Sequence, residues 1–140
     1  MADELGLYVH LTVTGGGRAV QWYEQVFEAT LKAKHMAEDG ERLLFAILAV
    51  FGSHVFVSDE FPESGPDTAA PGHSRPPSCT IHIDFAHPHD VNKIVARAEA
   101  AGATVTMKPE DVYWGDRYGR ICDPFGHVWS FGARAVPQQS

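Results

Sequence analysis

Two segments half a chain apart share one alternating pattern of apolar and polar residues. Residues 8–13 read YVHLTV and residues 80–85 read TIHIDF, and His10 and His82 occupy the same place in the two segments. Strict alternation is the period of a half-buried β-strand, because successive side chains point to opposite faces. The pattern therefore predicts a strand at the start of each half and an internal repeat.

Each predicted strand leads into a segment with the spacing of an amphipathic helix. In the first half, residues 18–29 follow a Gly15–Gly17 run and place Ala19, Val20, Tyr23, Val26 and Phe27 on one face. In the second half Val91, Ile94, Val95 and Ala98 have the same spacing. There Asp90 is the expected N-cap, and Gly102 is expected to close the helix.

Three strand-like runs follow each helix. They cover residues 30–38, 42–51 and 54–60 in the first half and 103–108, 118–122 and 127–133 in the second. Asp39-Gly40, Gly52-Ser53 and the Asp123–Gly126 segment provide turn signals. This order predicts an α+β fold of two βαβββ modules, at about 5–60 and 79–134, in a single domain of residues 1–140. One sheet cannot bury both faces alone, so we expect two curved sheets around a cleft.

The segment between the modules, residues 61–78, contains five prolines and is predicted to be a mobile linker. The chain has a net charge of −7, with 11 acidic against four basic residues in positions 1–70. No basic stripe is present to neutralise phosphates, which argues against nucleic-acid binding.

No apolar run is long enough to span a membrane, and the first residues lack the pattern of a secretory signal. We therefore expect a cytoplasmic protein that does not bind membranes. Cys79 and Cys122 lie in strand-like runs without metal-binding spacing, so buried free thiols are expected.

Two motifs in the second half resemble a known family. Residues 114–120 (WGDRYGR) and 123–130 (DPFGHVWS) are similar to the closing hairpin of the PhnB-like branch of the vicinal-oxygen-chelate (glyoxalase/bleomycin-resistance/dioxygenase) superfamily. Residues 19–28 resemble its first helix, and residues 98–105 the end of its second. The resemblance implies paired βαβββ modules, commonly a homodimer, and a pocket for a small-molecule ligand. It does not choose a reaction, because the superfamily contains several enzyme classes and drug-sequestering proteins.

Metal-dependent members of this superfamily carry a His or Gln on the first strand of each module and a carboxylate on the last. His10 and His82 are the candidate ligands for a divalent metal here, although Tyr8 lies closer than His10 to the usual position. The last strands carry no carboxylate at the expected places, near Ser58 and Ser130, while Asp84, Asp59 or Glu60 could supply an oxygen. We expect a small-molecule-binding protein without a complete catalytic metal site. A metal-dependent lyase, dioxygenase or transferase is the alternative.

The candidate ligand-binding residues are Tyr8, His10, His82, Asp84, Trp114 and Arg117. The first four lie on the polar faces of the two first strands. Trp114 and Arg117 place an aromatic ring and a guanidinium in one loop, which suits an anionic or carbonyl group. Alternatively, Arg117 pairs with Asp116 or Asp123 while Trp114 covers the end of the sheet. The Gly15–Gly17 run lacks the Gly-Lys-Ser/Thr ending of a phosphate loop, and no nucleophile–base arrangement can be assigned.

Overall fold

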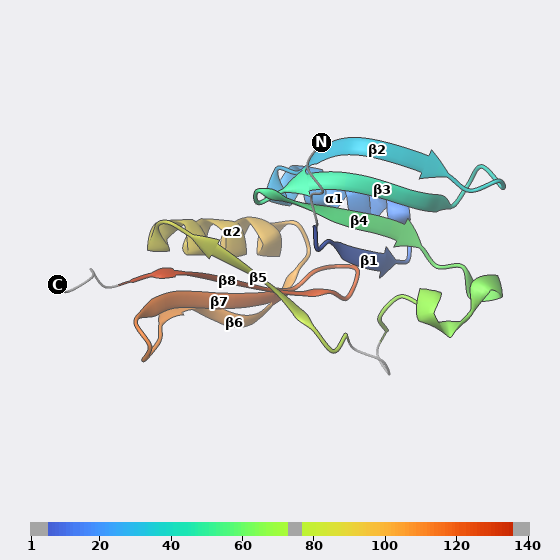
Figure 1. The fold of residues 1–140 in the computed structure, drawn as a ribbon. Helices are drawn as coiled ribbons and strands as arrows, with labels where there is room; N and C mark the ends of the chain where they lie inside the picture. The colour runs from blue at the N-terminus through green and yellow to red at the C-terminus, as the bar shows by residue number, and fades with distance from the viewer. Residues whose placement is uncertain (1–5, 73–76, 136–140) are drawn as a thin grey trace. The chain divides into compact units, whose positions relative to one another are not determined.

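The structure, a computed structural model, describes residues 6–72 and 77–135. The chain divides into two compact units, Met1–Ala70 and Pro71–Ser140, and the boundary lies within the predicted linker. The first unit contains β1 (Val9–Val13), α1 (Gly16–Phe27), β2 (Thr30–Met36), β3 (Leu43–Val50) and β4 (Ser53–Asp59) (Figure 1). The second contains β5 (Thr80–Phe85), α2 (Pro88–Ala100), β6 (Thr104–Asp111), β7 (Asp116–Cys122) and β8 (Val128–Arg134). The predicted βαβββ order is confirmed in both units.

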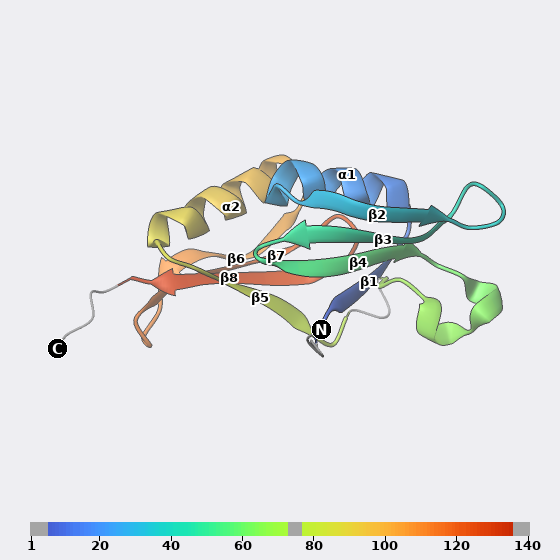
Figure 2. The same cartoon turned by 45° about the horizontal axis from the view of Figure 1, so that its top comes forward.

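The two sheets have the same topology. The strand orders are β1-β4-β3-β2 and β5-β8-β7-β6. The first strand of each unit pairs in parallel with the last, and the remaining pairs are antiparallel. Each helix lies over one face of its own sheet (Figure 2), so each sheet keeps a second face that its helix does not cover. We call this second face the open face.

The helix-covered faces hold the cores of the two units. In the first unit, the predicted apolar face of α1 is buried, and Leu11, Val13, Leu48, Val55 and Val57 of the sheet are buried with it. In the second, Val91, Ile94, Val95 and Ala98 of α2 are buried, as are Ile121, Trp129 and Phe131 of the sheet. The alternation that predicted the strands therefore also selected the buried residues correctly.

The start of α2 differs from the prediction. The helix begins at Pro88 after the N-cap His87, so Asp90 lies in the first turn and is not the cap. Proline suits the first helical position because its fixed φ is helical and no N–H is needed there. Asp90 still favours the helix, since a carboxylate interacts well with the positive end of the helix dipole. Gly102, at φ 104°, follows the last helical turn as expected.

The first part of the predicted linker is ordered within the first unit. It forms two short 3₁₀ turns, Pro62–Ser64 and Pro66–Thr68. Arg42 holds the first turn, because its NH1 and NH2 groups donate to the Glu63 carboxylate at 3.1 and 2.7 Å. The Arg42 guanidinium also lies 4.4 Å from the centre of the Phe61 ring. The expectation of a structureless linker is therefore wrong for residues 61–68.

The two cysteines differ in their exposure to solvent. Cys79 is exposed and Cys122 is partly exposed, and both are free thiols. The prediction that both are buried is wrong for Cys79, because it precedes β5 and does not join its buried face.

No helix in the described part of the chain combines the length and apolar character needed to cross a membrane.

Candidate functional site

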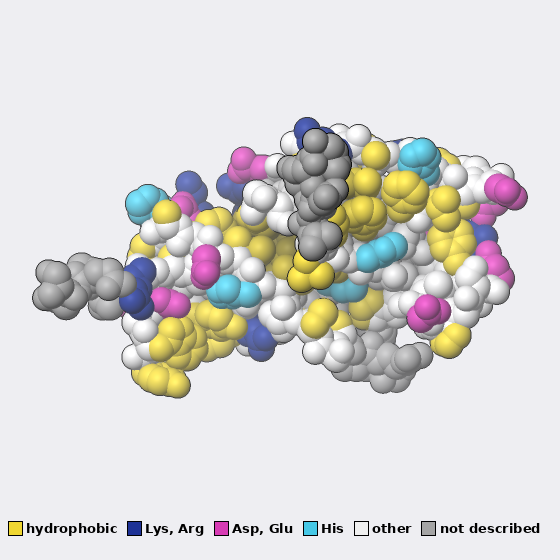
Figure 3. All heavy atoms as spheres, viewed as in Figure 1, with side chains coloured by type: hydrophobic (Ala, Val, Ile, Leu, Met, Phe, Trp, Pro, Cys, Tyr) yellow, Lys and Arg dark blue, Asp and Glu magenta, His cyan; other side chains and the backbone are white. Residues whose placement is uncertain are grey.

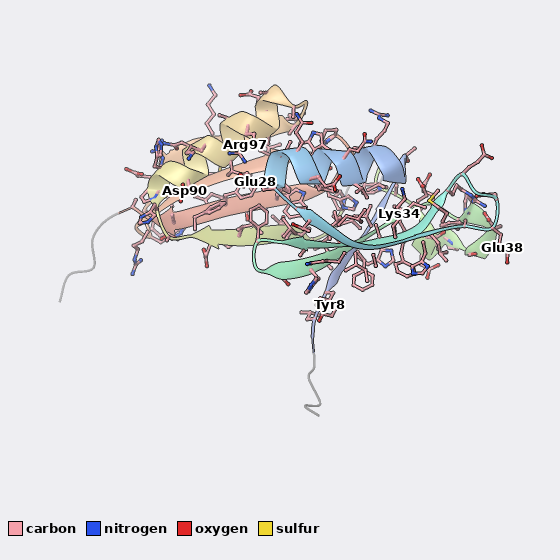
Figure 4. All side chains as sticks on the ribbon, turned by 90° about the horizontal axis from the view of Figure 1, so that it is seen from above. Tyr8, Glu28, Lys34, Glu38, Asp90 and Arg97 are labelled. Carbon is pink, nitrogen blue, oxygen red and sulfur yellow. The ribbon has the colours of Figure 1, made fainter. Side chains whose placement is uncertain are left out.

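A row of rings crosses all four strands on the open face of the first sheet. Phe56 of β4 lies at its centre, with ring centroids 5.9 Å from Tyr8, 6.1 Å from His10 and 6.3 Å from Phe45. Phe45 in turn contacts His35 of β2 at 4.7 Å. Figure 3 shows hydrophobic and histidine side chains interspersed over these strands, and Figure 4 shows Tyr8 on the side of β1 away from α1. The predicted candidates Tyr8 and His10 therefore share one aromatic surface.

His10, on the edge strand at one end of this row, also lines a pocket of about 510 Å³. Its Nε2 is 2.8 Å from the Oγ of Ser58, which is buried. Burial of the imidazole lowers the pKa of His10 below its usual value of 6.5, because desolvation disfavours the charged form. The site therefore presents a neutral imidazole at neutral pH, which can both donate and accept a hydrogen bond.

The folded part of the linker supplies the other wall of this pocket, which we call the His10 pocket. The strands contribute His10, Thr12, Leu44, Ser58 and Asp59, and the segment after β4 contributes Phe61, Ser64, Asp67 and Thr68. Thr68 fastens this segment, because its hydroxyl donates to the carbonyl oxygens of Phe61 at 2.7 Å or Gly65 at 2.8 Å. Sequence reasoning missed this wall because proline-rich segments between modules usually lack structure.

Asp59 is a structural anion and not a free ligand. One carboxylate oxygen accepts hydrogen bonds from the backbone N–H groups of Gly15 and Gly16 at 3.0 and 2.8 Å, and the other accepts from that of Leu43 at 2.7 Å. A Cβ on Gly16 would lie 2.8 Å from that of Leu43. Gly16 therefore lets α1 approach Asp59 and β3 closely, and the carboxylate occupies the position where a phosphate loop would hold an anion.

Glu60, the other carboxylate at the end of β4, also serves the backbone. Its Oε1 accepts a hydrogen bond from the N–H of Ala70 at 2.8 Å, and its Oε2 lies 3.5 Å from the Thr14 hydroxyl. Asp59 and Glu60, the two carboxylates expected as possible metal ligands in the first unit, therefore both accept hydrogen bonds from the backbone.

The open face of the second sheet brings His82 and Asp84 together, as their spacing on one strand predicts. The Nε2 of His82 is 2.9 Å from Oδ1 of Asp84, and its Nδ1 is 2.7 Å from the Oγ of Ser130. The ring also stacks on Tyr118, with centroids 6.0 Å apart and planes inclined by 18°. Gly132 lies beneath it, since a Cβ there would be 3.1 Å from the imidazole.

These contacts form a Ser130–His82–Asp84 hydrogen-bond chain that the sequence did not reveal. The chain has the residue types of a nucleophilic triad, but only 2% of Ser130 is exposed while 82% of the Asp84 side chain is exposed. A nucleophilic serine must be reachable by substrate, and the carboxylate that orients the histidine is normally the buried member. The chain instead orients the His82 ring on the open face.

Trp114 and Arg117 lie on opposite sides of the second sheet. The Trp114 ring is 5.7 Å from that of Tyr118 on the open face, and its indole N–H donates to Asp116 at 3.1 Å. Arg117 points to the helix side, where Nε donates to Asn92 of α2 at 3.1 Å and NH1 donates to Asp111 at 3.2 Å. The predicted joint aromatic–guanidinium site is therefore not formed. The alternative pairing of Arg117 with Asp116 or Asp123 is wrong as well.

The Asp123–Gly126 turn owes its form to the buried carboxylate of Asp123. One oxygen accepts from the backbone N–H groups of Phe125 and His127 at 2.9 and 3.0 Å, and the other accepts from the Trp129 indole at 2.9 Å. The second resemblance motif therefore shapes the β7–β8 hairpin. Sequence reasoning assigned the turn but missed the residue that holds it.

The two candidate metal ligands lie in different units, His10 in the first and His82 in the second. Within residues 6–72 and 77–135, no group of three or more His, Cys, Asp or Glu side chains is placed to hold a metal ion. His82 with Asp84 offers two adjacent donors, and His10 has Ser58 as its partner.

Comparisons with known proteins agree with this architecture. The family model described as Glyoxalase/Bleomycin resistance protein/Dioxygenase superfamily matches residues 7–131. The chain is 37% identical over 130 residues to Uncharacterized protein Mb0911c of Mycobacterium bovis, covering 92% of this chain and 83% of that protein. Uncharacterized protein Rv0887c of Mycobacterium tuberculosis is also 37% identical, with 92% and 74% covered.

Solved structures share the fold over nearly the whole chain. TioX from Micromonospora sp. ML1 is 27% identical with a TM-score of 0.70, covering 94% of this chain and 99% of that one. The fosfomycin resistance protein FosX from Listeria monocytogenes, in a complex with Mn(II) and sulfate, is 14% identical with a TM-score of 0.68, covering 95% and 93%. At that identity FosX shows a common fold only. The family match over residues 7–131 shows that the chain belongs to the glyoxalase/bleomycin resistance protein/dioxygenase superfamily.

Proposed function

We propose that this protein is a small-molecule-binding member of the PhnB-like branch, and that its ligand occupies the His10 pocket without the help of a catalytic metal. The observation that carries the proposal is the pocket itself, where the partly exposed imidazole of His10, bonded to Ser58, faces a wall that includes Phe61. Small-molecule sites are usually concave and carry polar groups fixed in position. Most residues that line this pocket are polar, and Leu44 and Phe61 supply its apolar surface.

The chemistry of the pocket favours a planar aromatic ligand with a positive charge. His10 and Phe61 offer two rings, and a flat ligand can stack on either. Asp67 and Asp59 line the same space, and the unit that contains them carries the excess of acidic residues. Negative side chains around a cleft raise the local concentration of cations.

Serine in place of a carboxylate beside the histidine is the main argument against a metal in this pocket. A serine hydroxyl is a weak neutral ligand, whereas divalent metals in catalytic sites are held by imidazole, carboxylate or thiolate groups. Asp59, the carboxylate that does line the pocket, already accepts three backbone hydrogen bonds.

A fluorescence titration tests the proposal. We use 9-aminoacridine as a planar aromatic cation and anthracene-9-carboxylate as a matched anion of similar ring size. The cation is expected to bind at least about tenfold more tightly than the anion. His10→Ala and Ser58→Ala are each expected to weaken its binding by about 1–3 kcal/mol. His89→Ala, which changes an exposed histidine of α2, serves as the control. Equal effects of the three substitutions would reject the His10 pocket as the site.

A metal-dependent lyase, dioxygenase or transferase is the second candidate. The adjacent His82 and Asp84 groups favour it, because an imidazole and a carboxylate are common partners of one divalent ion. Elemental analysis of the purified protein separates the two functions. Stoichiometric divalent metal that is lost in both His10→Ala and His82→Ala would establish the second function and overturn the first.

The proposal includes a cytoplasmic homodimer. Free thiols at Cys79 and Cys122 fit a reducing compartment. Apolar side chains exposed on β2 and β3 fit a protein–protein contact, since 37% of Leu31, 43% of Met36 and 48% of Leu44 remain accessible.

A further inference from the structure

A second hollow lies in the second unit, on the helix side of the sheet. It has a volume of about 390 Å³ and runs between α2 and the strands β6 and β7. We call it the α2–β6 groove. Val95 and Ala96 of α2 and Val105 and Pro109 of β6 provide its apolar lining, and three of these four keep some exposed surface. Its volume is within the range of pockets that hold small organic ligands.

A β-bulge shapes the strand wall of this groove. Met107 pairs with Arg120 and Glu110 pairs with Tyr118, so Lys108 and Pro109 together face the single residue Gly119. In a regular strand, neighbouring side chains point to opposite faces, yet Lys108 and Pro109 both line the groove. Bulges of this kind commonly redirect a side chain beside a functional site.

Gly119 allows the helix and the bulge to meet at the floor of the groove. A Cβ at this position would lie 3.2 Å from a methyl group of Val95 and 3.3 Å from the Pro109 ring. Pro109 is tolerated because β6 is the edge strand of the sheet and needs no ladder hydrogen bond on its outer side. The bulge that brings Lys108 to the groove is therefore built into the packing of this unit.

The rim of the groove carries two cations with unused donors. Arg117 is fixed by Asn92 and Asp111 through Nε and NH1, and its NH2 has no hydrogen-bond partner among the residues that the structure describes. Lys108 is exposed and has no ion pair in that same part of the chain. Glu99 also lines the groove and disfavours a second negative charge.

An apolar hollow under a fixed guanidinium and an ammonium group is complementary to a compact amphipathic anion. We propose that the α2–β6 groove is a second binding site, which takes a small organic monocarboxylate. The apolar body lies between Val95, Ala96 and Pro109, and the carboxylate accepts hydrogen bonds from Lys108 and the NH2 group of Arg117. This site shares no residue with the His10 pocket and does not depend on the function proposed there.

The probe is 2-naphthoate, with the neutral 2-naphthamide as its matched control, in a ¹⁵N-resolved NMR titration of the full chain. The expected result is saturable shifts of the amides of Val95, Ala96 and Val105. Lys108→Gln is expected to weaken naphthoate binding by about tenfold and to leave naphthamide binding unchanged, because only the carboxylate uses the ammonium group. Lys93→Gln removes the same charge from α2 outside the groove and is expected to change neither.

A second substitution tests the apolar body of the site. Ala96 is exposed on α2, so Ala96→Trp fills the groove without entering the core. It is expected to abolish the shifts caused by both probes, and the spectrum itself reports whether the variant is folded. Naphthoate shifts that avoid the groove overturn the proposal. So do equal losses of affinity in Lys108→Gln and Lys93→Gln, or unchanged binding in Ala96→Trp. Naphthoate shifts confined to the His10 pocket avoid the groove and therefore also overturn the proposal.

Discussion

His82 faces Ser130 directly across the parallel β5–β8 ladder, and its Nδ1 lies 2.7 Å from the serine oxygen. The first unit uses the same two residue types in another register. There His10 faces Phe56, Ser58 faces Thr12, and His10 reaches Ser58 diagonally through Nε2 at 2.8 Å. The two histidines therefore match in sequence but not in position relative to the last strand. The first unit consequently has a phenylalanine ring where the second has a hydroxyl.

The stability of the protein is expected to depend on pH through His10. Its pKa in the folded state lies below the usual 6.5 because of burial, so the unfolded chain binds the proton more tightly. The contribution of neutral His10 to the free energy of unfolding is complete above pH 6.5. It is lost as the pH falls through the pKa of His10 in the folded state. Denaturant unfolding at pH 7.5 and 5.5 measures the difference, which His10→Gln should reduce. His35→Gln is the control, and an equal reduction in that variant would contradict the assignment.

Two neighbouring glycines of α1 are expected to respond oppositely to alanine. A Cβ on Gly16 meets Leu43 at 2.8 Å, whereas a Cβ on Gly17 has nothing within 4 Å. Gly16→Ala should therefore destabilise the protein by about 1–3 kcal/mol through overpacking. Gly17→Ala should stabilise it by about 0.4–1 kcal/mol, because alanine restricts the unfolded chain. Thermal unfolding of both variants checks the pair, and a Gly16→Ala protein as stable as wild type would be the contrary result.

Two Trp→Phe substitutions separate a buried hydrogen bond from an exposed one. The Trp129 indole donates to buried Asp123, and its loss should cost about 1–3 kcal/mol because a buried carboxylate loses one of its hydrogen bonds. The Trp114 indole donates to Asp116 at a position that is 47% exposed, where water can replace it. Trp114→Phe should change stability by no more than about 0.5 kcal/mol. Urea unfolding measures both, and equal costs would argue against a structural role of Asp123.

Arg42 is expected to control the order of the wall after β4. Arg42→Lys keeps the charge but loses the forked contact with Glu63, so amide hydrogen exchange in residues 61–68 should become faster. Binding of 9-aminoacridine should weaken with it. Arg18→Lys on α1 is the matched substitution and should leave both measurements unchanged.

Arg42 forms ion pairs with Asp39 at 2.8 Å and with Glu63 at 2.7 Å, and both pairs are expected to persist in mild acid. Backbone hydrogen bonds from Arg42 and Glu41, with the Arg42 side chain, lower the pKa of Asp39 to about 2. Hydrogen bonding by Arg42 also lowers the pKa of Glu63. A carboxyl group whose pKa is lowered by folding stabilises the folded state fully above its usual pKa. This stabilisation disappears only as the pH falls through the lowered pKa of the folded state. The measurement is the protection of the amides of residues 61–68 relative to their intrinsic exchange rates. A loss of this protection already between pH 6 and 5 would contradict the assignment of the order of this segment to the Arg42 ion pairs.

A two-fold homodimer is expected in solution. Light scattering should report twice the chain mass of 15.3 kDa at micromolar concentration. Leu44→Glu, which charges one exposed apolar position on β3, should shift the protein toward monomer, while Glu41→Lys at an exposed polar position should not. A concentration-independent monomer in the wild type would reject the dimer.

The sequence predicted the elements well because each depends on a local period. Alternation located the strands, and the spacing of residues such as Val91, Ile94 and Val95 located the buried face of α2. Relationships between distant segments were not accessible in the same way. No local pattern states that Asp59 caps α1, or that the register of β8 brings Ser130 to His82.

Arg117 shows how proximity in sequence can mislead. It is three residues from Trp114 and was expected beside it, yet it lies in β7 with its side chain toward α2. The Trp114 ring instead contacts Tyr118 on the other face. Alternation along β7 separates Arg117 from both neighbouring open-face residues, Asp116 and Tyr118. The observed partner of Arg117 is Asp111, which lies opposite it because β6 pairs with β7. The distance between these residues in the sequence gives no indication of this contact.

The parallel pairing of β1 with β4 has a consequence for the order in which a growing chain can fold. β2, β3 and β4 can form hairpins with near neighbours, but β1 must wait for residues 55–59. Asp59 then joins the start of α1 and the start of β3 in one event, and Ala70 reaches back to Glu60. During synthesis the first unit therefore closes only when the chain as far as Ala70 has left the ribosome, and until then its first strand and helix remain exposed to chaperones.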